Sequence, residues 1–115
     1  MIAREYVEPL YNVKLYVIAK CKPGEADKKV ISLFGFNPEF DPKAYASIIQ
    51  HEDGKHFIMY LRKTDAGTII HEVSHMLDDV YTYRGIKHDC ACASCSEHRA
   101  HQLDGWLRII QLILK

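Results

Sequence analysis

The segment His71-Glu72-Val73-Ser74-His75 carries the residue types of a catalytic zinc site at a suitable spacing. On a helix, His71 and His75 are four residues apart, so both imidazoles project from one face. Two such nitrogens can bind one zinc ion at about 2.0–2.1 Å. Glu72 projects beside this face, where its carboxylate can take a proton from a zinc-activated water whose pKa is lowered towards about 7. The pattern predicts metal-assisted hydrolysis, with two surface histidines on an ordinary amphipathic helix as the alternative.

A catalytic zinc ion also needs a third protein ligand and an open position. Glu97 is the first candidate, because a carboxylate at the start of a second helix suits a helix–loop–helix zinc site. His88, His98 and His101 are the other candidates. A glutamate in the first turn of a helix also has a purely structural use, since its negative charge favours the helix dipole.

Several further residues could orient a ligand histidine or stabilise the oxyanion in the same site. Asp78 lies along the histidine stripe, so it could orient a ligand histidine or form an ion pair with Arg99 or Arg84. The tetrahedral intermediate of peptide hydrolysis needs a hydrogen-bond donor for its oxyanion. The candidates for that donor are Tyr81, Tyr83, His88 and His101.

A second cluster of metal-binding residue types follows the motif, namely His88, Cys90, Cys92 and Cys95. It could hold a second, structural zinc ion, although such sites usually use two separated pairs of ligands. A redox role and ordinary loop cysteines are the alternatives. Cys21 lies far away in sequence and is expected to be a buried strand residue.

The elements that must position these residues are strands first and helices later. Residues 11–21 alternate between apolar and polar types, as in a half-buried strand, and residues 22–25 predict a turn. The apolar run 30–36 predicts another strand, with a short helix ending near Gly35 as the alternative. Asp53-Gly54 between the β-prone runs 44–51 and 55–62 predicts a hairpin. An edge strand over 55–62 could bind an extended peptide beside the zinc site.

Helical spacing replaces this alternation after Thr64 and Asp65, either of which could cap a helix. One apolar stripe comprises Ile69, Val73, Met76, Leu77 and Val80, and Gly85 is a plausible stop. A second helix is expected from Ser96 to the end, with a stripe of Ala100, Leu103, Leu107, Ile110 and Leu114. We therefore expect an α+β fold in which a small antiparallel sheet with a β-hairpin precedes the motif helix and an apolar C-terminal helix.

Length and composition limit the class of protein. A chain of 115 residues with 48% hydrophobic content predicts one folded domain over 1–115. The 15 basic and 15 acidic residues cancel, which argues against a nucleic-acid partner. No apolar run reaches membrane-spanning length and no signal peptide is recognisable, so we expect a cytoplasmic protein. The apolar C-terminal helix is compatible with either a monomer or a homodimer.

The motif and its surroundings resemble the small zincin-like metallopeptidases encoded by phages and prophages. The similarity lies in Thr68–Asp78, which includes the HExxH sequence, and in Ser96-Glu97-His98-Arg99-Ala100-His101 before an apolar helix. The resemblance implies a minimal zincin-like fold, Glu97 as third ligand in the gluzincin manner, and a setting in the host-cell cytoplasm. His101 departs from the family, in which an aromatic residue is common there, and the cysteine-rich loop is unfamiliar.

These observations predict a zinc-dependent metallopeptidase acting on a protein or peptide substrate. Its metal ligands would be His71, His75 and Glu97, and Glu72 would be its general base. The alternative is a catalytically weak or inactive zincin-fold protein that binds zinc and acts by binding a host or phage protein. A relation to SprT-like proteases, which act on DNA-bound proteins, is disfavoured by the balanced charge.

Overall fold

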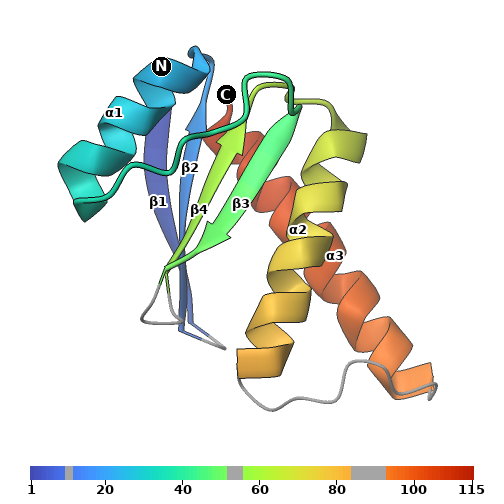
Figure 1. Cartoon of the computed structure of the whole chain (residues 1–115). Coiled ribbons are helices and arrows are strands. Elements are labelled where there is room, and N and C mark those ends of the chain that lie inside the picture. The colour runs from blue at the N-terminus through green and yellow to red at the C-terminus, as the bar shows by residue number, and fades with distance from the viewer. Residues whose placement is uncertain (10–11, 52–55, 84–92) are drawn as a thin grey trace.

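A computed structural model describes residues 1–9, 12–51, 56–83 and 93–115, without the side chains of residue 83 and residues 93–96. The chain forms four strands and three helices in these ranges (Figure 1). Their order is β1 (Ile2–Glu8), β2 (Val13–Ala19), α1 (Pro23–Phe34), β3 (Ala46–Gln50), β4 (His56–Leu61), α2 (Ala66–Tyr83) and α3 (Ala93–Ile113). The α+β class is confirmed by this arrangement.

The four strands form one mixed sheet in the order β1-β2-β4-β3. β1 pairs antiparallel with β2, and β3 pairs antiparallel with β4, as the predicted hairpin requires. The two central strands, β2 and β4, are parallel, with Leu15 opposite Phe57 and Ala19 opposite Leu61. The prediction of a purely antiparallel sheet was therefore wrong, because α1 carries the chain across the sheet between β2 and β3, a crossover of the kind that parallel strands need.

Each face of the sheet has its own helical cover. The face covered by α2 and α3 holds the larger core, which includes Leu15, Val17, Phe57, Met59 and the α3 residue Trp106. The face covered by α1 holds a smaller core of Ile18, Ala26, Val30, Phe40, Ile58 and Tyr60. β2 and β4 are thus buried on both faces, not half-buried, and β4 is a central strand instead of the predicted edge strand.

The helix α1 replaces the turn and strand that were predicted for this part of the chain. Pro23 occupies the first turn, where its missing N–H is not needed, and the Lys22 N–H donates to the Glu25 carboxylate at 3.2 Å. Ala26 and Val30 face the sheet and are buried. Gly35 ends the helix with φ 78°, a left-handed conformation that favours glycine. The alternative of a helix ending near Gly35 is confirmed.

Both predicted C-terminal helices are present, and they cover the same face of the sheet (Figure 1). Every member of the predicted α2 stripe is buried, namely Ile69, Val73, Met76, Leu77 and Val80. α3 begins at residue 93, three residues before the predicted start, and packs Trp106 and Ile110 into the same core. The predicted α3 stripe is confirmed only in part, because Ile110 is buried and Leu103, Leu107 and Leu114 are half-buried, whereas Ala100 is exposed. Among the described residues, no helix is both long and apolar enough to cross a membrane.

Candidate functional site

The motif residues sit in the first half of α2, and Asp65 fixes where this helix begins. The carboxylate of Asp65 accepts hydrogen bonds from the Thr68 N–H at 3.1 Å and the Thr68 hydroxyl at 2.7 Å. These two bonds satisfy a free donor of the first turn and hold the pKa of Asp65 below its ordinary value. Asp65 is therefore the N-cap, and His71 follows it after about one and two-thirds turns.

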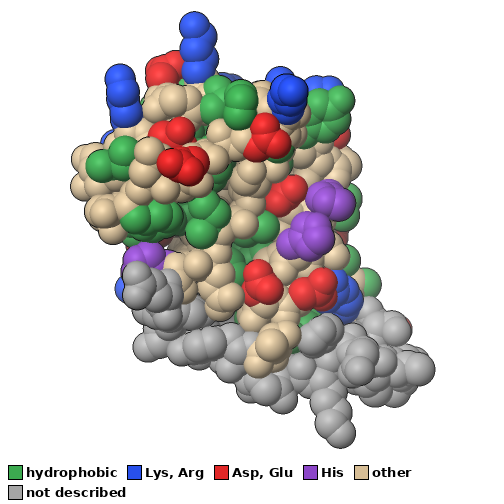
Figure 2. Space-filling model, in the orientation of Figure 1, with side chains coloured by type: hydrophobic (Ala, Val, Ile, Leu, Met, Phe, Trp, Pro, Cys, Tyr) green, Lys and Arg blue, Asp and Glu red, His purple; other side chains and the backbone are tan. Residues whose placement is uncertain are grey.

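The side chains of His71 and His75 converge above α2. Their Nε2 atoms lie 3.2 Å apart, and the ring centroids are separated by 4.7 Å with the planes at 82°. For zinc–nitrogen distances of about 2.0–2.1 Å, this separation gives an N–Zn–N angle of about 100–106°, close to tetrahedral. Both rings are exposed, and Figure 2 shows a pair of histidine side chains at the surface over α2. The pair fits a metal ion, and the same distance suits a hydrogen bond between two neutral imidazoles.

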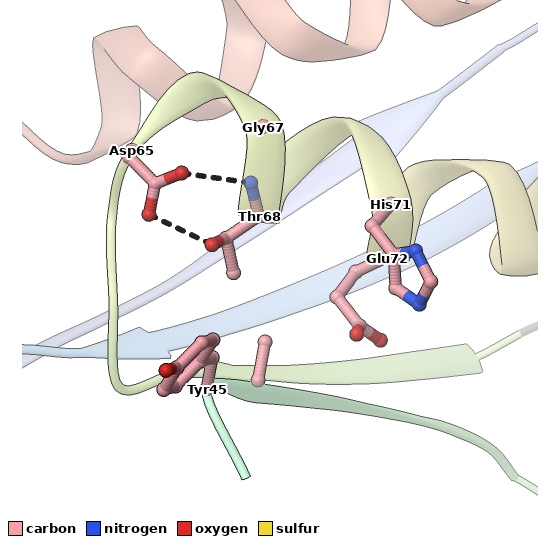
Figure 3. A pocket seen from close by; sticks show the side chains of 7 residues that line it. Tyr45, Asp65, Gly67, Thr68, His71 and Glu72 are labelled. Carbon is pink, nitrogen blue, oxygen red and sulfur yellow. Dashed lines mark hydrogen bonds between the residues drawn. The ribbon is translucent and has the colours of Figure 1, made fainter.

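Glu72 points in a different direction from the two histidines and is only 8% exposed. It lines a pocket of about 500 Å³ whose wall also includes Tyr45, Ala46, Thr68 and His71. In Figure 3 its carboxylate extends from α2 toward the strand side of this pocket, where Tyr45 lies. As predicted, Glu72 stands beside the histidine stripe, and a carboxylate here can reach a molecule in the pocket.

Tyr45 is a pocket residue that sequence analysis did not single out. Its backbone carbonyl accepts hydrogen bonds from the N–H groups of Arg62 and Lys63, both at 2.9 Å. The Lys63 ammonium lies 3.7 Å from the centroid of the Tyr45 ring. These contacts hold Tyr45 beside the start of β3. No local pattern indicates them, because they join segments on either side of the hairpin.

The side chain of Arg99, in α3, contacts α2 at Ser74, within the motif, and at Asp78, just after it. It donates to the Ser74 hydroxyl at 2.9 Å and to the Ser74 carbonyl at 3.3 Å, and it pairs with Asp78 at 3.0 Å. The Arg99 side chain is 24% exposed and that of Asp78 is 47% exposed. The predicted pairing of Asp78 with Arg99 is confirmed, so Asp78 serves the contact between the two helices.

Glu97 does not join the histidine pair in this structure. It is exposed on α3 and precedes Arg99 by two residues, which places it about 200° around the helix axis from the side that contacts α2. Within the described ranges, no three His, Cys, Asp or Glu side chains form a group that could hold a metal ion. The assignment of Glu97 as third ligand remains a prediction.

The other candidate residues are distributed around the fold. His98 is exposed with its ring 6.1 Å from that of Tyr81, and His101 lines a separate cavity beside β1. Tyr81 is 2% exposed within the core, which leaves it unsuited to contact a substrate oxyanion. The side chain of Tyr83, and all of Arg84, Gly85, His88, Cys90 and Cys92, lie outside the described residues, as does the side chain of Cys95. Cys21 is a half-buried free thiol just after β2, and burial raises its pKa.

Comparison with protein-family models, curated proteins and solved structures finds no match to this chain.

Proposed function

We propose that the protein is a zinc-dependent metallopeptidase of the HExxH type. The observation that carries the proposal is the convergence of the His71 and His75 Nε2 atoms to 3.2 Å. Two further features support it: Glu72 lies next to this pair, and its carboxylate lines a pocket large enough for part of a peptide. The resemblance of Thr68–Asp78 to phage and prophage zincin-like enzymes agrees with the proposal, and a phage origin in a host-cell cytoplasm is proposed with it.

In the proposed reaction Glu72 is the general base. A bound zinc ion would supply Lewis acidity, lowering the pKa of a water molecule and polarising the peptide carbonyl. The Glu72 carboxylate takes the proton of the attacking water and passes it to the amine that leaves. Its low exposure favours this task, because charge interactions are stronger where water is largely excluded.

An extended peptide could reach this site along the free edge of β3. In the described part of the sheet, β3 pairs only with β4, and its first residue, Ala46, lines the pocket that Glu72 enters. A peptide added to this edge would form main-chain hydrogen bonds with β3 and pass in front of α2. Sequence analysis assigned peptide binding to the strand over residues 55–62. Because that strand is central and β3 is the edge strand beside the pocket, β3 is the strand proposed for peptide binding here.

The third ligand in the proposal is Glu97, as the family resemblance implies. For Glu97 to reach the histidine pair, the first turn of α3 must rotate toward α2, which would require Arg99 to release Ser74 and Asp78. His88, in the segment between the two helices, is the competing candidate. Separate variants that remove the Glu97 carboxylate or the His88 imidazole decide which of the two residues is the third ligand.

The test is the metal content of the purified protein, measured by elemental mass spectrometry. About one zinc ion per chain is expected in the wild type and little in His75→Ala. The same loss in Glu97→Ala would establish the third ligand, whereas loss in His88→Ala would replace it. The conservative variant Asp41→Asn, at an exposed carboxylate outside this site, is the matched control. Protein that was never exposed to chelators and binds no metal would contradict the proposal.

Hydrolysis is tested with Glu72→Gln, which keeps the shape of the side chain and removes the base. Cleavage of an unstructured protein such as casein by the zinc-loaded wild type, lost in Glu72→Gln with zinc retained, supports the enzyme. A protein that holds zinc and cleaves nothing would instead be the predicted alternative, a zinc-binding protein that acts by binding a partner.

A further inference from the structure

The pocket of about 500 Å³ beside the histidine pair has two ends of different chemistry. His71 and Glu72 form the end at which the proposed reaction takes place. The other end, called the outer end below, comprises Tyr45, Ala46, Asp65, Gly67 and Thr68. Figure 3 shows the outer end between the first turn of α2 and the start of β3, with Tyr45 on the strand side.

The polar side chains of the outer end are engaged with one another. The Asp65 carboxylate accepts hydrogen bonds from the N–H and the hydroxyl of Thr68, at 3.1 and 2.7 Å. These bonds, and also the positive charge of Lys63, lower the pKa of Asp65, so the negative charge has a cation near it. The surface left for a ligand is therefore mainly the Tyr45 ring and the small residues Ala46 and Gly67. Such a surface favours an apolar side chain.

Tyr45 gives the outer end an aromatic surface that is exposed and held in place. The residue is 55% exposed. The Lys63 ammonium lies 3.7 Å from the ring centroid but does not line the pocket, so it covers the ring from the side away from the pocket. The Arg62 guanidinium fixes the preceding backbone by donating to the carbonyls of Lys43 and Ala44 at 3.1 and 2.7 Å. The side of the ring toward the pocket is thus presented to a ligand in a fixed orientation.

The spacing along α2 relates the outer end to the reacting bond. Thr68 precedes Glu72 by four residues, which is about 6 Å along the helix axis. A peptide paired with the free edge of β3 advances about 3.4 Å per residue and turns every second side chain to the α2 face. Ala46 lies on this face, since it packs against the larger core. A side chain that enters beside Ala46 therefore belongs to a residue within about two positions of the bond next to Glu72.

We propose that the outer end receives an aromatic side chain of the substrate, and that Tyr45 determines this specificity. Ala46 and Gly67 leave space for the ring, and an offset or edge contact with Tyr45 adds to the gain from burial. The identification of the occupant as a substrate rests on the proposed function. Binding in the pocket itself requires neither a metal ion nor hydrolysis.

Binding is tested by NMR titration of isotope-labelled protein without added metal. The probe is N-acetyl-phenylalanine methylamide, and the cyclohexylalanine analogue, of similar size but without an aromatic ring, is the matched ligand control. We expect saturable shifts of the Tyr45, Ala46 and Gly67 amide signals, and binding of the phenylalanine probe that is about two- to tenfold tighter. No saturation, shifts only elsewhere in the protein, or equal affinity for the two probes would each overturn the proposal.

Three variants assign the preference to Tyr45. Tyr45→Ala should remove the difference between the two probes, whereas Tyr45→Phe should keep it. Ile31→Ala removes a side chain that is 45% exposed on α1, which covers the other face of the sheet, and should bind as the wild type does. Thermal melts establish that each variant is folded. Full preference for the phenylalanine probe in folded Tyr45→Ala would overturn the role given to this residue.

Cleavage distinguishes this proposal from the proposed function. A peptide mixture is treated with the zinc-loaded protein, and the cleavage sites are identified by mass spectrometry. Cuts within two residues of Phe, Tyr or Trp are expected to predominate. Cuts without this preference would overturn the assignment of the pocket and leave the metallopeptidase intact. Tighter binding of the phenylalanine probe without any cleavage would support the pocket and contradict the metallopeptidase.

Discussion

Replacing Gly105 with alanine should stabilise the protein, and the structure sets the size of the effect. Alanine is favoured over glycine in a helix interior by about 0.8–1.0 kcal/mol, because glycine loses more backbone entropy on folding. The new methyl group meets no atom within 4 Å, so no packing strain offsets this gain. The free energy of unfolding should therefore rise by about 1 kcal/mol, and the melting temperature of a chain this size by about 4–5 °C.

Urea denaturation followed by circular dichroism measures this change, and Gly35→Ala provides the contrast. Gly35 ends α1 with φ 78°, where a side chain is strained, so alanine there should lower the unfolding free energy by about 1–2 kcal/mol. The slope of the unfolding free energy with urea should not change in either variant. A loss of stability in Gly105→Ala would contradict the open helical position described for this glycine. Equal effects at Gly105 and Gly35 would contradict the difference in their backbone conformations.

Three other substitutions test the contacts that hold the sites together, each by urea denaturation. Asp65→Ala should lower the free energy of unfolding through loss of the α2 cap, whereas Asp65→Asn should change it little at neutral pH. Because the folded pKa of Asp65 is lowered, its contribution is complete above about pH 4 and is lost as the pH falls through the folded value, so Asp65→Asn should show a smaller loss in acid. Arg99→Met should lower the unfolding free energy by about 1–2 kcal/mol, since it removes the hydrogen bonds to Ser74 and an ion pair that is partly exposed. Tyr60→Phe should cost about 1 kcal/mol, because the buried Tyr60 hydroxyl donates to the Cys21 carbonyl at 2.8 Å. Unchanged stability in Asp65→Ala, Arg99→Met or Tyr60→Phe would contradict the role given to that contact.

The elements that sequence analysis identified correctly are those with a strong local pattern. The helical spacing of the α2 stripe and the Asp-Gly pair between two β-prone runs predicted both elements. Local capping chemistry also placed the start of α2 at Thr64 or Asp65, and the structure shows that Asp65 is the cap, because its carboxylate accepts the hydrogen bonds from Thr68. Within the site, the spacing of His71, Glu72 and His75 was enough to predict two converging imidazoles and a carboxylate beside them.

The segments that were predicted wrongly either contain residue types that suit two different structures or depend on contacts between residues far apart in the sequence. Lys22-Pro23-Gly24 resembles a turn, yet proline is equally suited to the first turn of a helix. The apolar residues 30–36 combine the buried face of α1 with the residues just after it. β1 was not predicted, although Ile2 and Tyr6 pack against the larger core. The position of Glu97 depends on how Arg99 engages α2, a contact across 25 residues of sequence that no local pattern specifies.

The parallel pairing of β2 with β4 has a consequence for how the chain folds. It joins Lys14 to His56 and Ala19 to Leu61, whereas the β3–β4 hairpin and α2 need only neighbouring residues. Closing so long a loop loses chain entropy before any pairing can offset it, and non-local pairing of this kind slows folding. We expect the hairpin and the helix with the two histidines to form early. The central pair, and with it the burial of the α1 face, should set the folding rate.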